Sequence, residues 1–317
     1  MKRIVQLDAL RALAIALVML AHYRSAFGVS TRDVLAPMGR YGVVVFFVIS
    51  GFIIPRVMAL ANYRLRGLAA FMYRRVLRLY PPYLVALALT IGLSLSAALA
   101  KHVAIQWSAG DLIGWLVYVG APSENPVFWT LQVEMCFYLF LALLFPLLNG
   151  SSPQQRWLGF LGACLLGYFG ASHLLFFNYL GFFLLGLSLE QYQRDHNLRE
   201  FCLRLIPALA LSWNDSAALS VAFAVTTMLI IAGGDRIPWP RPVLFLGGVS
   251  YSFYLIHFPV GVKFINAMTE RRSDIPGIPL LAAAFLLSLA CAYLLFKTIE
   301  NPFARLAARK RVENALS

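Results

Sequence analysis

Long apolar runs recur along almost the whole chain, and they restrict its fold more than any other feature. Runs of membrane-spanning length lie near residues 9–27, 41–60, 79–100, 127–148, 157–175, 176–191, 216–233, 243–266 and 279–299. A shorter run at 201–213 predicts a further helix. Because 60% of the 317 residues are hydrophobic and only 13% are charged, a soluble core does not account for the composition. The sequence therefore predicts an all-α, polytopic membrane protein with about ten transmembrane helices.

The basic residues set the expected orientation of these helices. Ten spans put both termini on one side of the membrane, and 19 of the 27 Lys and Arg residues fall on that side, seven on the other and Arg11 within the first span. The positive-inside rule makes the richer side cytoplasmic. We expect a membrane domain, residues 1–300, and a basic cytoplasmic tail, 301–317, whose "RLAARKR" contacts anionic lipids. The net charge of +13 then reflects topology and indicates no nucleic-acid partner.

One segment stands apart from the expected spans. The stretch "DLIGWLVYVGAPSENP" at 111–126 is interrupted by glycine, proline and polar residues, so we expect a short re-entrant or interfacial piece. No loop is long enough to hold a soluble domain. Function must therefore lie within the membrane or at its surfaces.

Three ionisable residues at the start of the chain, Asp8, Arg11 and His22, can share one face of the first span. At 100° per residue, Arg11 and His22 fall within about 20° of one helix face, and Asp8 within about 40° of His22. Such groups are costly in lipid and mark functional sites, although a lone histidine can equally well donate a hydrogen bond between helices. Burial keeps an imidazole neutral and able to accept a proton, so we expect His22 to act as a general base. Arg11, about 16 Å below it, is well placed to hold an anion entering from the cytoplasm.

The motif "FMYRRVLRLYPPY" puts a basic cluster at the expected cytoplasmic end of a span. Arg74 and Arg78 are four residues apart and Arg75 and Arg78 are three apart, so on a helix they form a fork that suits phosphates. Ordinary positive-inside anchoring explains the same residues. Pro81 and Pro82 are expected to bend or start the span.

Ser50 and Gly51 interrupt the apolar run "VFFVISGFIIP". Glycine allows close backbone approach, and a broken helix can present backbone amides to a ligand. Close packing of small residues between helices explains the pair equally well.

Two later spans carry polar residues. The motif "NPVFWTLQVEMCFYL" brings Glu134 into a span, with Tyr138 four residues later. A carboxylate there could orient the histidine of the first span, or it could form a structural ion pair with an arginine. The motif "GGVSYSFYLIHFPV" holds Tyr251, Tyr254 and His257. Interfacial packing accounts for the tyrosines, and His257 serves either a site or a helix contact.

In this order the segments resemble the bacterial acyltransferase 3 family of integral-membrane O-acyltransferases, in its stand-alone form. The resemblance rests on "LDALRALAIALVMLAH" with its Arg-x10-His, "VVFFVISGFII", "FMYRRVLRLYPPY", "FWTLQVEMCFYL", "GGVSYSFYLIHFPV" and "IENPFARL". These pieces run over nearly the whole chain. The form "WTLQVE" departs mildly from the commoner "WSLSVE" but keeps Trp129 and Glu134 in place.

The resemblance implies an acyl-CoA-dependent O-acyltransferase of the bacterial cytoplasmic (inner) membrane. It would move an acyl group, usually acetyl from acetyl-CoA, to a hydroxyl of an exported or envelope carbohydrate such as an exopolysaccharide, an O-antigen or a lipid-linked oligosaccharide. With the reasoning above, the candidate catalytic residues are His22, Glu134 and Asp8. The candidate acyl-CoA-binding residues are Arg11, Arg74, Arg75, Arg78, Ser50, Gly51 and Phe52. The candidate acceptor or channel residues are Trp129, Tyr138, Tyr251, Tyr254 and His257.

Acyl-CoA enters as a substrate, and we expect no metal or prosthetic group. The four cysteines lack the paired spacing of a zinc site or a disulfide framework.

Two alternatives to an acyltransferase stay open. A secondary transporter would also have a midplane His, Glu and Arg. It typically shows inverted repeats whose broken helices match in pairs, and the sequence indicates one broken helix without a matching second one. A structural or assembly membrane protein would need no buried polar stripe.

Overall fold

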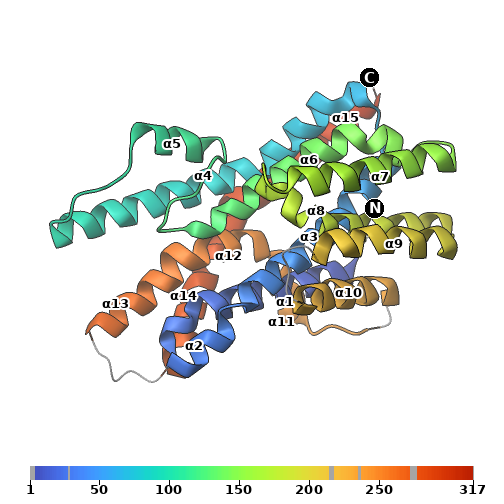
Figure 1. Ribbon diagram of the computed structural model, residues 1–317. Coiled ribbons are helices and arrows are strands. Elements are labelled where there is room, and N and C mark those ends of the chain that lie inside the picture. The colour runs from blue at the N-terminus through green and yellow to red at the C-terminus, as the bar shows by residue number, and fades with distance from the viewer. Residues whose placement is uncertain (1–3, 28, 214–217, 235–236, 272–276, 317) are drawn as a thin grey trace. The chain divides into compact units, whose positions relative to one another are not determined.

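Helices and their connections make up the whole of the described chain. The computed structural model describes residues 4–27, 29–213, 218–234, 237–271 and 277–316, and these contain no strand (Figure 1). The α-helices are α1 (Val5–His22), α2 (Val29–Leu35), α3 (Met38–Leu60), α4 (Leu68–Lys101), α5 (Ala109–Leu116), α6 (Trp129–Leu148), α7 (Pro153–Gly170), α8 (Leu175–Asp195), α9 (Leu198–Trp213), α10 (Ala218–Gly233), α11 (Arg241–Gly248), α12 (Ser250–Ile256), α13 (Lys263–Arg271), α14 (Gly277–Leu295) and α15 (Asn301–Leu316). The described residues also form the 3-10 helices η1 (Tyr23–Ala26), η2 (Leu65–Gly67) and η3 (Pro126–Phe128) and the π-helices η5 (His257–Val262) and η6 (Phe296–Glu300). The all-α prediction is confirmed.

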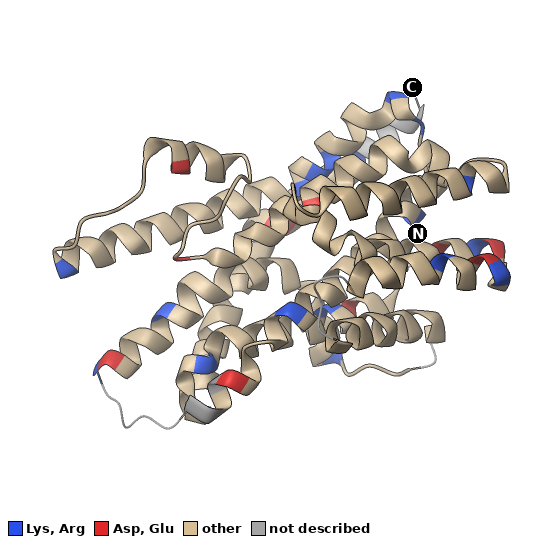
Figure 2. Cartoon of the chain, in the orientation of Figure 1, with Lys and Arg blue, Asp and Glu red and all other residues tan. Residues whose placement is uncertain are grey.

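Each apolar run lies mainly on one helix or on consecutive helices, and the first two residues of the run at 216–233 lie outside the described residues. In the part of the chain that the structure describes, five helices are long and apolar enough to cross a membrane, or six if the bent pair Arg241–Gly248 and Ser250–Arg271 forms one span. The protein is thus a multi-pass membrane protein. The count of ten spans and the cytoplasmic position of both termini remain predictions. Charged residues are sparse along the long helices and gather where α8 gives way to α9, among other helix ends (Figure 2).

The helices pack into two compact units. Unit 1 comprises Met1–Ala14, Arg40–Met72 and Val133–Gly247, and unit 2 comprises Ile15–Gly39, Tyr73–Gln132 and Gly248–Ser317. The helices α1, α4 and α6 each begin in one unit and end in the other.

In unit 1, α8 packs against α7, α9 and α10 (Figure 1). Its contact with α3 depends on two glycines, because a Cβ at Gly51 would lie 2.7 Å from the Cα of Phe183, and a Cβ at Gly186 would lie 2.7 Å from the backbone nitrogen of Phe52. Helix α3 runs unbroken through this point, so the break expected at Gly51 is wrong. The glycine instead lets two helix backbones approach closely, as in the packing alternative.

In unit 2, α14 packs along α12 and η5. A buried core of Tyr23, Val262, Ile265, Leu280 and Ala284 joins the end of α1 to these helices. Both π-helices belong to this unit. Because π-turns are rare and frequently mark functional sites, the region around η5 is the first place to look for chemistry.

Helix α4 starts eleven residues before the expected span and runs through both prolines, so Pro81 and Pro82 do not start it. Two successive prolines remove two backbone donors from the helix, which membrane helices tolerate when neighbouring groups satisfy the freed carbonyls. The carbonyls freed here are those of Leu77 and Arg78. Next to them, the hydroxyl of Tyr251 donates to the carbonyl of Leu79 at 2.7 Å. The basic cluster is therefore carried on continuous helix.

The segment predicted to lie outside the spans forms the short helix α5. Ser108 and Asp111 close a capping box at its start, in which each side chain bonds the backbone N–H of the other. These hydrogen bonds hold the pKa of the Asp111 carboxyl below its usual value. At the other end, the hydroxyls of Tyr80 and Tyr83 donate to the carbonyls of Leu116 and Trp115. The helix is thus fastened to α4 at its last turn.

Candidate active site

His22 lies where the first helix changes its winding. It is the last residue of α1, and the chain continues directly into the 3-10 helix η1. Its side chain is partly exposed, unlike those of its neighbours Ala21 and Tyr23, which are buried. A reactive group in a membrane helix needs this access, because a substrate must reach it.

The imidazole of His22 pairs with a second imidazole from the other end of the chain. Its Nδ1 lies 2.9 Å from Nε2 of His257, the first residue of η5. The other ring nitrogen of His257, Nδ1, lies 2.7 Å from the carbonyl oxygen of Tyr254. His257 is completely buried, with 0% of its surface exposed. The sequence analysis placed His257 among the acceptor or channel residues, and the structure places it behind His22.

Aromatic rings hold the histidine pair from both sides. The ring of Phe258 meets His22 edge-on at 5.3 Å between centroids. The ring of Phe253 stacks nearly parallel to His257 at 6.2 Å. Each imidazole thus has an aromatic neighbour as well as its hydrogen bond.

Tyr23 connects the same two segments one residue further along. Its hydroxyl donates to the carbonyl of His257 at 3.2 Å and shares a 2.6 Å hydrogen bond with Ser288 of α14. Gly261 leaves room for this hydroxyl, since a Cβ there would collide with it and would lie 2.6 Å from Oγ of Ser288. All of these groups are buried. Consecutive residues of the first segment, His22 and Tyr23, are thus both hydrogen-bonded to His257.

A buried polar layer fixes the position of α12 itself. The hydroxyl of Tyr254 donates to the carbonyl of Val127 at 3.0 Å and lies 2.7 Å from Oγ1 of Thr130. The amide of Asn125 donates to Oγ1 of Thr90 at 3.1 Å and to the carbonyl of Leu255 at 3.3 Å. Tyr254 was predicted as an acceptor or channel residue, and in the structure its buried hydroxyl is engaged in this layer.

The basic cluster lies on α4 in the same unit. Arg78 is exposed, and Arg74 and Arg75 are half-buried. The contact of Tyr251 with Leu79 fixes this part of α4 to the first turn of α12. His257 follows six residues later, or about 9 Å further along the helix axis. The cluster and the histidine pair thus belong to one unit and are connected through α12.

Unit 1 holds the other two ionisable residues of the first helix. Nη1 of Arg11 and Oδ1 of Asp8 form an ion pair at 3.0 Å, three residues apart on α1. Gly247 of α11 packs directly on this turn, because a Cβ there would collide with the carbonyl of Asp8. Of the polar stripe predicted on α1, Asp8 and Arg11 thus pair with each other, whereas His22 is hydrogen-bonded to His257.

Glu134, also in unit 1, accepts hydrogen bonds from two hydroxyls. Ser50 donates to its Oε1 at 3.3 Å, and Tyr138 donates to the same oxygen. Phe52 and Gly51 are buried beside them, whereas Trp129, at the start of α6, is half-buried. A role for Glu134 toward His22 remains a prediction, and the imidazole partner that the structure gives His22 is His257.

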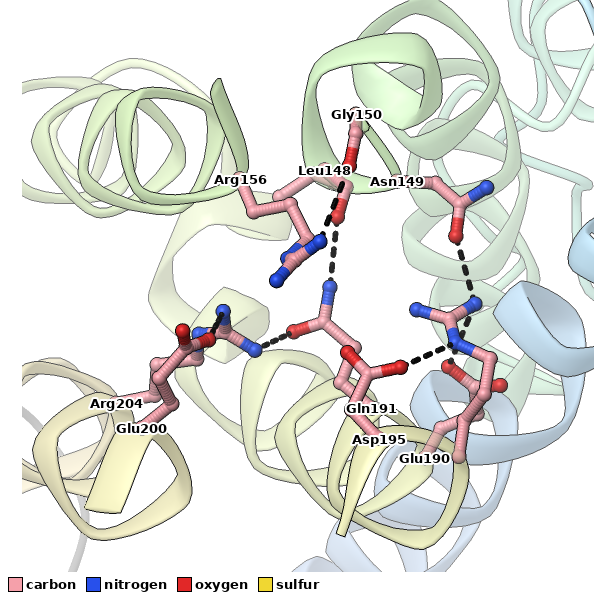
Figure 3. A network of polar contacts seen from close by, with 10 residues as sticks. Leu148, Asn149, Gly150, Arg156, Glu190, Gln191, Asp195, Glu200 and Arg204 are labelled. Carbon is pink, nitrogen blue, oxygen red and sulfur yellow. Dashed lines mark hydrogen bonds and ion pairs between the residues drawn. The ribbon is translucent and has the colours of Figure 1, made fainter. Parts of the chain in front are cut away.

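A second buried polar network, in unit 1, was missed by the sequence reasoning. Gln191 of α8 donates to the carbonyl of Leu148 at 2.7 Å and accepts from Nη1 of Arg204 at 2.5 Å (Figure 3). Arg204 is paired with Glu200 at 2.5 Å and lies over the ring of Trp157. Further polar contacts around it come from Asn149, Gly150, Arg156, Glu190, Arg194 and Asp195.

This network closes the end of α6 against α8 and α9. The last carbonyls of a helix lack partners within the helix, and here Gln191 satisfies one of them. The signal in the sequence was the presence of Glu190 and Arg204 beside apolar runs, where ionisable groups need partners. Arg204 reaches Gln191 of α8, and Glu190 pairs with Arg194 on its own helix, which indicates a structural role.

Comparison with known proteins decides the family. A family model described as an acyltransferase domain, that of the acyltransferase 3 family, matches residues 4–297. The chain belongs to this family. No curated protein and no solved structure matches it significantly. The predicted family is therefore confirmed, and the chain is a multi-pass membrane acyltransferase.

The matched region contains both residues of the histidine pair, the basic cluster and the Glu134 site. It also argues against the transporter alternative, and the unbroken α3 removes the one broken helix that a transporter would have to match with a second. The acyltransferase thus has one partly exposed imidazole, oriented by buried groups, within its family domain.

Proposed function

We propose that this acyltransferase transfers an acyl group, acetyl in the first instance, from acyl-CoA to a hydroxyl of an exported or envelope carbohydrate. The observation that carries the proposal is the partly exposed His22 imidazole, held by buried partners in a chain of an acyltransferase family. An exopolysaccharide or a lipid-linked oligosaccharide is the acceptor that we favour, and the bacterial cytoplasmic membrane is the proposed location.

His22 acts as the general base in this proposal. It removes the proton from the attacking hydroxyl as the oxygen adds to the thioester carbonyl, so a C–O bond forms. The C–S bond then breaks, and His22 returns the proton to the departing CoA thiolate. Atoms and charge balance without a metal or a redox group. A step of this kind is typically worth about 10²–10⁴ in rate.

The arginines of α4 hold the CoA phosphates. Arg74 and Arg78 lie one helical turn apart, and an arginine fork binds phosphate oxygens in pairs. The flexible pantetheine arm would then run up beside α12, past the level of Tyr251, and present its thioester to His22. Arg11, on the same helix as His22, is a further proposed contact for this anionic donor.

Donor and acceptor are proposed to enter from opposite sides of the membrane. The basic residues assign the arginine cluster to the cytoplasmic side, whereas His22 is about 21 Å along α1 from Asp8, past the middle of a roughly 30 Å hydrocarbon core. CoA is a cytoplasmic, highly charged metabolite that does not cross lipid. The acyl group would thus be delivered through the protein to a carbohydrate outside.

Oriented vesicles test this proposal. Acetyl-CoA labelled in its acetyl group and supplied on the side of the N-terminus should label a sugar acceptor that is present only on the opposite side, and His22→Ala vesicles should not. Labelling only when both substrates share one side would overturn cross-membrane delivery while leaving acyl transfer intact. No labelling and no hydrolysis of acetyl-CoA under any arrangement would overturn the proposed donor.

A further inference from the structure

The contacts around the histidine pair determine which nitrogen of each ring carries a proton. A neutral imidazole has one N–H donor and one acceptor nitrogen. The carbonyl oxygen of Tyr254 can only accept, so Nδ1 of His257, 2.7 Å away, must be the donor. Nε2 of His257 then carries no proton and presents a lone pair. It can accept only from His22, whose Nδ1 lies 2.9 Å from it.

We infer that His257 is a positioning residue that holds His22 in the Nδ1–H tautomer, so that Nε2 of His22 is the basic nitrogen. The inference rests on the proposed function of His22 as a base. A chain of two hydrogen bonds, from His22 to His257 and from His257 to a backbone carbonyl, performs the orientation. Because the carbonyl cannot take up a proton, the chain ends there, and the proton taken from the acceptor stays on His22 until the thiolate removes it.

Burial supports this division of roles between the two histidines. His22 is partly exposed and can meet a substrate, whereas His257 has no exposed surface and cannot. His257 is further fixed through its own backbone carbonyl, which accepts from Tyr23. Without such a partner, a neutral histidine prefers the Nε2–H tautomer, which would point a proton instead of a lone pair at the acceptor hydroxyl.

The test uses three substitutions of His257 that differ only in which hydrogen bond they keep. In His257→Gln the amide oxygen stands near the position of Nε2 and can accept from His22. In His257→Asn the shorter side chain can still bond the Tyr254 carbonyl but does not reach His22, and His257→Leu keeps the volume without either bond. His173→Leu, at an exposed histidine in the loop between α7 and α8, is the matched control.

We expect kcat to fall about 10²–10⁴-fold in His257→Asn and His257→Leu, the range seen when a general base is lost or held in the wrong tautomer. The KM for acetyl-CoA should change little, since His257 touches no donor phosphate. His257→Gln should keep kcat within about tenfold of wild type. The control His173→Leu should have the kcat of wild type. Equal losses in the Gln, Asn and Leu variants, or a full kcat in His257→Leu, would overturn the inference.

Nitrogen-15 NMR of the five histidines, in detergent, reads the tautomer directly and independently of acyl transfer. The resonances of His22 are identified by their absence in His22→Ala. Wild type and His257→Gln should show His22 protonated at Nδ1 and unprotonated at Nε2, and His257→Leu should show the reverse. A wild-type His22 protonated at Nε2 would refute the tautomer even if acyl transfer is confirmed. The expected tautomer in a protein without transferase activity would refute the proposed function alone.

Discussion

Gly261 offers the sharpest test of how the histidine pair is supported, because the structure gives it no room for a side chain. In Gly261→Ala the new Cβ would collide with the hydroxyl of Tyr23 and lie 2.6 Å from Oγ of Ser288, about 1 Å inside the ordinary contact distance. Tyr23 and Ser288 have no exposed surface, so neither can swing into solvent. The tyrosine must move, and its hydrogen bonds to Ser288 and His257 must lengthen or break.

The size of the effect follows from these contacts. Overpacking a core typically costs about 1–3 kcal/mol, and leaving buried hydrogen-bonding groups unsatisfied costs about 1–3 kcal/mol more. The better helix propensity of alanine returns up to about 1 kcal/mol. We therefore expect Gly261→Ala to lose about 1–6 kcal/mol of unfolding free energy, or on the order of 2–9 °C in apparent melting temperature.

Thermal unfolding of the purified protein in detergent measures this loss, and acetyl transfer is measured on the same samples. Gly92→Ala is the matched control, since Gly92 lies on α4 in the same unit and a Cβ there meets nothing within 4 Å. It should be as stable as wild type or gain up to about 1 kcal/mol. If Gly261→Ala has the same melting temperature as Gly92→Ala and retains full activity, Tyr23 does not support His257 in the way described.

Three further substitutions test the remaining assignments. His22→Ala should abolish transfer while melting near wild type, because the base is lost but a small residue still fits the helix; turnover above about a tenth of wild type would argue against a catalytic base. Arg74→Ala combined with Arg78→Ala should chiefly weaken CoA binding in calorimetry, since charge-assisted phosphate bonds are lost, and Arg305→Ala, which removes an exposed arginine of α15, should not. Arg204→Leu should lower the unfolding free energy by about 3–5 kcal/mol, the cost of leaving a buried ion-pair partner alone, and an unchanged melting temperature would show that the network of Figure 3 does not hold α8 to α9.

The fold class followed from the sequence because lipid leaves the backbone few options. Spanning segments must satisfy their own hydrogen bonds, so each apolar run had to be a helix, and the observed helices coincide with the expected runs. Helix ends and interruptions were less predictable. Proline and glycine suggested a helix start at Pro81 and a break at Gly51, but neighbouring helices override local preferences: α4 continues through its prolines and α3 through its glycine.

The candidate site was predictable only in part. Periodicity brought Asp8, Arg11 and His22 to one face of a helix, and the first two do pair. It could not show that His22 and His257 meet, because they are 235 residues apart and no local pattern reports a long-range contact. A helix whose histidine faces lipid and a helix whose histidine faces another helix have the same pattern in the sequence. The family resemblance marked both segments, but only the structure shows that their imidazoles lie within hydrogen-bonding distance.

The π-turn that begins at His257 explains how one buried residue can hold two successive residues of the first helix. An α-helix directs consecutive side chains about 100° apart, so His22 and Tyr23 would not ordinarily engage the same partner. Here the first uses the ring of His257 and the second uses its backbone carbonyl, and the missing side chain of Gly261, four residues on, leaves space for the tyrosine hydroxyl. The wider π-turn thus places a ring nitrogen and a carbonyl of one residue against two adjacent groups. The end of α1 is thereby attached to His257 at two points, through the ring of His22 and the hydroxyl of Tyr23.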